Sequence, residues 1–226
     1  PLVAMGRIGV YDKLLMIPLF TGMSMTELEG IVGETRLLFR KVEEGERVVS
    51  DGDRCGRLVI LVEGSLRMST VSDDHALTVE EELSGCHVLQ PECAFGLHQR
   101  FTHTYQALTP CSLISIDKKE ALRLTSVSLI FRLNLINLIS TTLQKENGKA
   151  WRCPPRSLEE RVVRYLSDHC FLRTGKKVFR VKKERLAQDL NEGQRQVSGC
   201  LRVLQDRGLL TLHRGRIDVP ALENLT

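Results

Sequence analysis

The fold is decided by the stretch Arg185-Leu-Ala-Gln-Asp-Leu-Asn-Glu-Gly-Gln-Arg-Gln-Val-Ser-Gly-Cys-Leu-Arg-Val-Leu204, whose apolar spacing is that of two short helices joined by a tight turn. The inward-facing residues are Leu186 and Leu190 in the first helix and Val197, Cys200, Leu201 and Leu204 in the second. Asn191 tolerates the left-handed backbone that a rapid reversal needs, and Gly193 stands at the N-cap of the second helix. Ala187 is small enough to let the helices cross closely. The stretch predicts a helix-turn-helix that contacts DNA, and packing alone is the alternative.

Positive charge is concentrated in the part of the chain that contains this stretch. Residues 151–226 contain 16 Lys and Arg against 9 Asp and Glu, whereas residues 1–150 contain 16 against 19. A local positive excess favours duplex DNA, because neutralising phosphates releases condensed counterions. The charge distribution therefore predicts double-stranded DNA as the partner of the C-terminal part.

The composition is that of an ordinary globular protein. The 226 residues suffice for two domains, 42% are hydrophobic, and no apolar run has membrane-spanning length or the pattern of a secretory signal. We therefore expect a cytoplasmic protein without a membrane segment. The cysteines are scattered without a Cys-x-x-Cys pair, at Cys55, Cys86, Cys93, Cys111, Cys153, Cys170 and Cys200. This spacing predicts neither a disulfide framework nor a metal site such as a zinc ribbon.

Residues 1–125 are predicted to form a domain built around a β-roll. A short helical segment is expected around residues 12–36, and β-rich runs alternate with glycine-marked turns over residues 37–117. The best strand candidates are Val48-Val49, Leu58–Val62, Leu66–Val71, Leu77–Val79 and Leu113–Ile116. The pattern predicts a small all-β barrel or roll.

Residues 126–150 are predicted to contain a long helix with two apolar faces. One stripe recurs at spacings of four and three and consists of Leu129, Leu133, Ile136, Ser140 and Leu143. The opposite stripe consists of Phe131, Leu135, Leu138 and Thr142. A helix that is apolar on both sides must be covered twice, so we expect one face on the β-domain and the other against a second copy in a homodimer. Burial of a single helix within one large domain is the alternative.

Residues 151–226 are predicted to form a separate domain. Pro154-Pro155 excludes a continuous helix within the segment from Gly148 to Arg156, which is the expected hinge. The pattern from Ser157 to Glu160 is that of a capping box, and it predicts a helix through about Phe171.

The last expected elements are a strand at Val178–Val181 and a hairpin at Leu209–Val219, which would make the helix-turn-helix winged. With a β-roll, a long helix and a winged helix-turn-helix in that order, the chain resembles the Crp-Fnr family of bacterial transcription regulators. The most specific segments of this resemblance are Val42–Asp53, Leu58–Ser65 and Lys182–Leu210.

The resemblance implies an α+β fold: an effector-sensing double-stranded β-helix or jelly-roll like that of cyclic-nucleotide-binding domains, a dimerisation helix, and a C-terminal winged helix-turn-helix. It also implies a homodimer on a palindromic operator, with a ligand or redox signal that alters the relative pose of the two DNA-binding domains. RNA polymerase would be a further partner of an activator. The sequence identifies neither the operator nor the small-molecule effector.

On this resemblance, the residues that point from the second helix into the major groove are Gln194, Arg195, Ser198 and Arg202. Arg195 has the donors for guanine O6 and N7, and Gln194 can pair with adenine N6 and N7. Phosphate contacts are expected from Lys182, Lys183, Arg214 and Arg216. The helix opens with Gly193-Gln194-Arg195 where the family commonly has Ser-Arg-Glu, so no operator sequence carries over.

The expected effector site departs from that of the nucleotide-binding members. Those members carry a Gly-Glu pair for the ribose and an Arg-Ser or Arg-Thr pair for the cyclic phosphate, because a buried phosphate requires charge-assisted donors. This chain has Gln90 and Glu92 near the first pair and Arg100 and Thr102 near the second, with neither in register. These four are the candidate effector ligands, and we expect no tight binding of cyclic AMP.

Other functions are weighed against this one. Haem is an alternative ligand of the same regulator, since the soft or imidazole side chains in or near the roll are Met68, Cys86, His87, Cys93, His98 and His103. An N-terminal iron-sulfur cluster is not expected, because the first cysteine is Cys55. A module that controls a partner protein would use its winged helix as a protein-contact surface. An enzyme is not expected, since no nucleophile-base pair, phosphate loop or metal-hydrolase motif is present.

Overall fold

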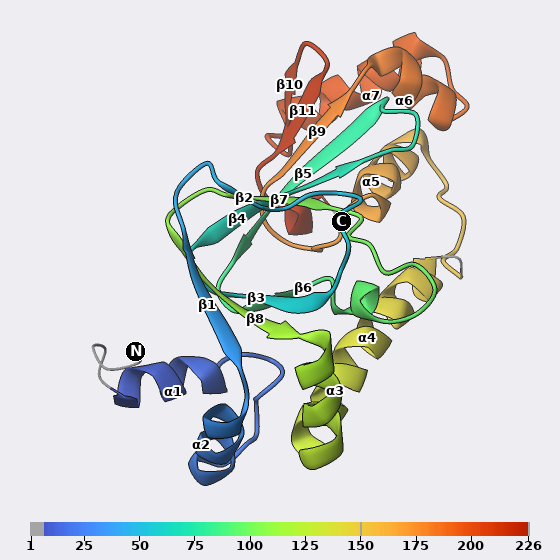
Figure 1. Cartoon of the computed structure of the whole chain (residues 1–226). Coiled ribbons are helices and arrows are strands. Elements are labelled where there is room, and N and C mark those ends of the chain that lie inside the picture. The colour runs from blue at the N-terminus through green and yellow to red at the C-terminus, as the bar shows by residue number, and fades with distance from the viewer. Residues whose placement is uncertain (1–6, 150, 226) are drawn as a thin grey trace. The chain divides into compact units, whose positions relative to one another are not determined.

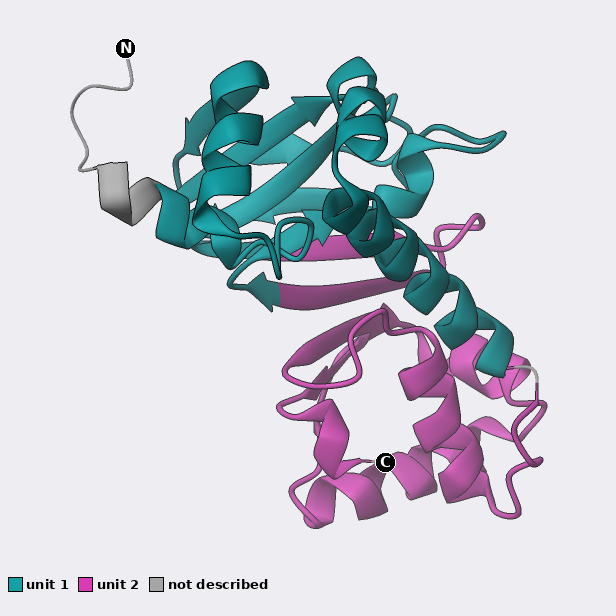
Figure 2. Cartoon of the chain, turned by 90° about the horizontal axis from the view of Figure 1, so that it is seen from below, with its two compact units in different colours: residues 1–66, 83–148 teal, residues 67–82, 149–226 magenta. Residues whose placement is uncertain are grey.

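The structure, a computed structural model, describes residues 7–149 and 151–225. The chain forms two compact units (Figures 1 and 2): unit 1 comprises residues 1–66 and 83–148, and unit 2 comprises residues 67–82 and 149–226. The segment 67–82 lies within the predicted roll in sequence, yet it packs with the C-terminal part. Within the described ranges, no helix combines the length and the apolar character needed to cross a membrane.

The helices described in unit 1 are α1 (Arg7–Leu15), α2 (Met25–Glu34), α3 (Lys118–Val127) and α4 (Leu129–Lys149). The first two form the predicted helical segment. Helix α2 begins after Ser24, whose hydroxyl accepts a hydrogen bond from Glu27 N at 3.2 Å. Helix α4 begins after Ser128, whose hydroxyl accepts one from Phe131 N at 3.3 Å. It extends through Gly148, so the expected hinge starts later than predicted.

The strands of unit 1 are β1 (Leu37–Val42), β2 (Arg47–Val49), β3 (Arg57–Glu63), β6 (His87–Leu89), β7 (Thr104–Ala107) and β8 (Cys111–Asp117). An antiparallel sheet has the order β1-β8-β3-β6, and β2 pairs with β7. Strand β3 is buried on both faces from Leu58 to Val62, so it forms the centre of this core. The turn after β3 requires Gly64 (φ +96°), because a Cβ there would lie 2.7 Å from the Pro110 carbonyl oxygen.

The two predicted stripes of α4 differ in exposure as expected for a helix covered on one side. Phe131 and Leu135 are buried, and the Phe131 ring packs 5.8 Å from the Phe20 ring between centroids. The side chains of Leu129, Leu133, Ile136 and Leu143 are all about half exposed, at 58%, 48%, 51% and 59%. The inward face is fixed further by Asn134, whose amide donates to the carbonyl oxygens of Leu19 and Thr21.

The elements of unit 2 are β4 (Ser65–Val71), β5 (Leu77–Ser84), α5 (Leu158–Asp168), β9 (Lys177–Val181), α6 (Lys183–Asp189), α7 (Gln194–Asp206), β10 (Thr211–His213), β11 (Arg216–Val219) and a short 3-10 turn at Leu222–Asn224. The first residues of β4 and the last residues of β5 belong to unit 1. Strands β10, β11, β9, β5 and β4 are neighbours in that order. Ser157 caps α5 as predicted, since its hydroxyl accepts a hydrogen bond from Glu160 N at 3.1 Å.

Strand β5 is added to the edge of the C-terminal sheet. Its antiparallel register with β9 places Leu77 opposite Val181, Val79 opposite Phe179 and Glu81 opposite Lys177. Leu77 and Val79 join the buried core that Phe179 shares with the helices of unit 2. Part of this core is therefore supplied by a hairpin from the first half of the chain.

Helix α5 ends at Asp168, three residues before the predicted end. The amide groups of Phe171 and Leu172 donate to the Glu81 carboxylate at 2.8 and 2.9 Å instead of continuing the helix. Glu81 also lies 3.0 Å from the Lys177 ammonium. The prediction of a longer helix was wrong because this buried acceptor, distant in sequence, competes for the backbone donors.

Candidate nucleic-acid interface and candidate effector site

Helices α6 and α7 are joined by a turn with the predicted backbone geometry. Asn191 has a φ of +51°, and Gly193 is the N-cap of α7, where its amide donates to Gln196 Oε1 at 3.2 Å. Arg161 of α5 holds the turn, because its guanidinium donates to the Leu190 carbonyl oxygen and pairs with Glu192. Ala187 is buried, as are the predicted inward residues except for the half-buried Cys200: Leu186, Leu190, Val197, Leu201 and Leu204.

The opposite face of α7 is polar and open. Gln194, Arg195 and Arg202 are exposed, and Ser198 is half-buried. Gln194 Nε2 donates to Glu184 Oε1 on α6 at 2.8 Å. The start of α7 is thus tied to the start of α6, which orients the Gln194 carboxamide.

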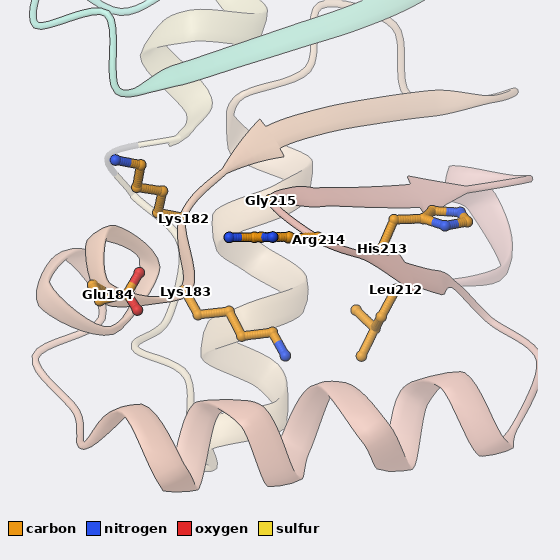
Figure 3. A pocket seen from close by; sticks show the side chains of 7 residues that line it. All are labelled: Lys182, Lys183, Glu184, Leu212, His213, Arg214 and Gly215. Carbon is orange, nitrogen blue, oxygen red and sulfur yellow. The ribbon is translucent and has the colours of Figure 1, made fainter.

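A hollow of about 820 Å³ lies between the start of α6 and the β10–β11 turn (Figure 3). Its lining residues are Lys182, Lys183, Glu184, Leu212, His213, Arg214 and Gly215. Lys182 is the N-cap of α6 and Lys183 its first residue, while Arg214 extends from the turn toward them. Three of the four predicted phosphate contacts therefore line one hollow.

Arg216, the fourth predicted phosphate contact, is held by a neighbouring carboxylate. Its Nε and Nη2 atoms donate to Asp218 at 2.5 and 2.7 Å, and this bidentate pairing raises the pKa of Arg216. His213 and Glu184 line the hollow but were not named from the sequence. The signal for the Arg216 pairing was available, since side chains two residues apart on a strand share a face.

In unit 1, the structure brings Gln90 and Thr102 together. Gln90 is 3% exposed. Its Oε1 accepts hydrogen bonds from Thr102 N at 3.1 Å and His103 N at 3.2 Å, and its Nε2 donates to Thr102 Oγ1 at 2.7 Å. Gln90 adopts the left-handed conformation with φ +41° and precedes Pro91 at the start of a 3-10 turn. Two of the four candidate effector ligands are therefore hydrogen-bonded to each other.

Glu92 lies next to this pair in a poorly solvated position. Its Oε2 is a buried side-chain oxygen without a hydrogen-bond partner among the described residues. Burial raises the pKa of the Glu92 carboxyl, although a hydrogen bond from Gln90 opposes the shift. Burial also raises the pKa of Cys93 to about 11 and the pKa of Cys55. These thiols are therefore in their neutral form at physiological pH.

Arg100, the fourth candidate effector ligand, is exposed and donates from Nη1 to the Gly52 carbonyl oxygen at 2.6 Å. The guanidinium is thus engaged by backbone. As for a metal, no group of three or more His, Cys, Asp and Glu side chains within the described ranges is arranged to hold one.

Comparison with known proteins bears on the second of these sites, the candidate effector site. Residues 39–127, from within β1 to the end of α3, match the cyclic nucleotide-binding domain family. This stretch is therefore similar to a cyclic nucleotide-binding domain. The match contains the predicted roll and all four candidate effector ligands. None of the curated proteins matches the chain.

The chain is also similar to solved structures. The c-di-GMP-responsive global regulator CLP of Xanthomonas campestris has 19% identity and a TM-score of 0.50, covering 87% of this chain and 99% of that chain. A Crp/Fnr-family regulator from Eubacterium rectale has 21% identity and a TM-score of 0.49, over 93% and 96%. The catabolite activator protein of Thermus thermophilus has 17% identity and a TM-score of 0.49, covering 92% of this chain and 96% of that chain. The family match supports the predicted cyclic-nucleotide-binding-like roll, and the likeness to CLP supports the predicted fold.

Proposed function

We propose that the chain is a sequence-specific DNA-binding transcription regulator in which α6, α7 and the β10–β11 hairpin form a winged helix-turn-helix. The observation that carries the proposal is the hollow that Lys182, Lys183 and Arg214 line from two elements. Cations gathered around one hollow fit a phosphate backbone that passes between the wing and the start of α6. A surface that binds a partner protein through apolar contacts would not require three cations around one hollow.

The two kinds of DNA contact come from different residues. Arg195 and Arg202 stand on the open face of α7 and are the candidates for base edges, whereas the cations of the hollow contact phosphates. Gln194 is the bridge between the two groups, because its carboxamide is held by Glu184 at the rim of the hollow. Arg216 is not proposed as a primary phosphate contact, since Asp218 neutralises it.

The regulator acts as a homodimer in this proposal. The outward stripe of α4 contains four large apolar side chains that are each about half exposed, while Phe131 and Leu135 of the inward stripe are already buried. A second copy of the same helix covers this stripe best, because like surfaces on a two-fold axis repeat the spacing of their apolar residues. Two DNA-binding units related by a two-fold axis read a palindromic operator.

The cyclic nucleotide-binding domain is proposed to sense a small-molecule effector. Cyclic AMP is a poor candidate, because Arg100 is engaged by the Gly52 carbonyl and the donors at Thr102 and His103 are engaged by Gln90. RNA polymerase is a partner if the regulator activates transcription.

Selection of duplexes from a randomised library by the purified full-length protein tests the proposal. We expect a palindromic consensus and an affinity that falls steeply with salt, since several phosphates are neutralised. Enrichment of no sequence, together with binding that is insensitive to salt, would contradict the proposed function. Lys176→Ala is a suitable control for substitution of a cation of the hollow such as Lys183, because Lys176 is an exposed cation of unit 2 that does not line the hollow.

A further inference from the structure

The Gln90 side chain makes contacts that an external ligand would otherwise make. Two backbone N–H groups of consecutive residues, Thr102 and His103, converge on its Oε1, and the Thr102 hydroxyl contacts its Nε2. Converging N–H groups of consecutive residues with a neighbouring hydroxyl form a typical site for an anionic oxygen. In this structure a neutral carboxamide of the same chain fills that place.

The backbone of Gln90 shows that this arrangement is imposed by its surroundings. A φ of +41° is unfavourable for a residue with a Cβ, and it persists where other interactions hold it. Among the described residues, the Gln90 side chain is held by hydrogen bonds with the 102–103 turn, Cys93 and Glu92. Release of the side chain from the turn would therefore let the start of the 3-10 turn relax.

We propose that the Thr102–His103 turn is an oxyanion-binding site that Gln90 occupies as an internal ligand, so that an oxyanion binds only when Gln90 leaves. The biological meaning of this proposal rests on the proposed function of this domain as an effector sensor. Binding and displacement are one event in this mechanism. Because Gln90 directly follows β6, the event changes the conformation of the segment Gln90–Ala94.

The neighbouring groups indicate which oxyanion fits. Glu92 Oε2 is buried without a partner, so it can accept a hydrogen bond from a hydroxyl that the ligand carries beside its anionic group. Arg100 directs Nη1 to the Gly52 carbonyl oxygen. The ligand class is therefore a phosphate or carboxylate, and a hydroxyl on the same molecule adds affinity.

Gln90→Gly in the full-length protein tests the mechanism. Glycine adopts a φ of +41° without penalty, and the substitution removes the carboxamide from the turn. We expect inorganic phosphate and cyclic AMP to bind the wild type only in the millimolar range or above. The variant should bind phosphate at least tenfold more tightly, with perturbed amide resonances at Thr102 and His103. Calorimetry and NMR titration measure the two effects.

Further variants separate the contacts. Gln106→Ala is the matched control, because it removes a carboxamide that donates to the Gly45 carbonyl oxygen elsewhere in unit 1, and it should gain no anion affinity. Adding Thr102→Val to Gln90→Gly should lower the gained affinity severalfold, since the hydroxyl is lost. Tighter binding of cyclic AMP than of phosphate, abolished by Glu92→Leu, would support the second contact of the ligand, because leucine has no acceptor.

Two results would overturn the proposal. One is a folded Gln90→Gly protein with no greater affinity for phosphate than the wild type. The other is micromolar binding of either probe by the wild type. If Gln90→Gly does not fold, Gln90→Asn opens the turn by shortening the side chain, and the same expectations apply. None of these measurements uses DNA, so failure of the proposed DNA-binding function would leave their outcome unaffected.

Discussion

The Glu81 carboxylate and the Lys177 ammonium lie 3.0 Å apart with side-chain exposures of 1% and 0%. The pair joins strand β5 to strand β9, which are neighbours in the sheet of unit 2. Glu81 also accepts two backbone hydrogen bonds, and Lys177 Nζ donates to the Thr174 carbonyl oxygen at 2.7 Å. Both charges are thus compensated, as burial of an ion pair requires.

Removal of one member of this pair should destabilise the protein strongly. We expect Lys177→Met to lower the free energy of unfolding by about 3–5 kcal/mol, because the Glu81 carboxylate is left buried without its counter-ion. The double variant Glu81→Gln/Lys177→Met should be more stable than Lys177→Met, since a neutral carboxamide still accepts a backbone hydrogen bond. Urea unfolding of both variants measures the difference. Equal stability of Lys177→Met and wild type would show that the pair is not buried in solution.

Arg195→Ala should reduce specific DNA affinity by about 1–3 kcal/mol and relax base preference at one operator position per half-site, if its guanidinium contacts a base. Lys183→Ala should instead weaken all sequences to a similar extent and reduce the magnitude of the salt slope by about 1, because it removes a phosphate contact. Binding selections with both variants distinguish the two roles. An unchanged base preference for Arg195→Ala would exclude this residue from the readout.

Ile136→Glu should disrupt dimers, because it places a charge at the centre of the outward stripe of α4, where Ile136 is 51% exposed in a single chain. Sedimentation velocity over a range of protein concentrations measures the effect, and operator affinity should fall with it. Thr141→Glu is the control, since Thr141 is exposed on α4 and lies outside both apolar stripes. A variant that remains a tight dimer would place the interface elsewhere.

The stability of unit 1 should depend on pH through Glu92, whose pKa is raised by burial. A raised pKa in the folded state stabilises the protein fully below the unfolded value of about 4.3, and this contribution is lost as pH rises through the folded pKa. Glu92→Gln should therefore be more stable than wild type at pH 7, with a difference that shrinks toward pH 4. Denaturation at several pH values tests this, and Glu44→Gln, which removes an exposed carboxylate, is the control.

Local elements were predictable because their signals are local. Helix α7 has its apolar residues at helical spacing and a glycine at its N-cap, and both features appear in the structure. The strands β2, β3, β4, β5 and β8 contain the five predicted runs. Strands β1, β6 and β7 were not among the predicted runs; β7, Thr104-Tyr-Gln-Ala107, contains one large apolar side chain.

Partners that are distant in sequence were not predictable. Alternation along Leu77–Val79 indicates which side chains share a face but not which strand lies beside them. Glu81 resembles any surface acid until Lys177 and the amides of Phe171 and Leu172 are placed around it. Gln90 was named as a site residue, but its main partners are backbone N–H groups, which every residue except proline carries.

The addition of β5 to β9 also has a consequence for how the nascent chain folds. Val79 pairs with Phe179, which is synthesised 100 residues later. At roughly 5–20 residues per second, translation takes on the order of 5–20 s to cover that distance. During this interval the residues that bury Leu77 and Val79 in the folded protein have not yet been synthesised, so this apolar face is exposed. A nascent chain stalled before β9 would keep it exposed. Chaperones that recognise exposed apolar strands should therefore bind nascent chains that end between β5 and β9 more than completed ones.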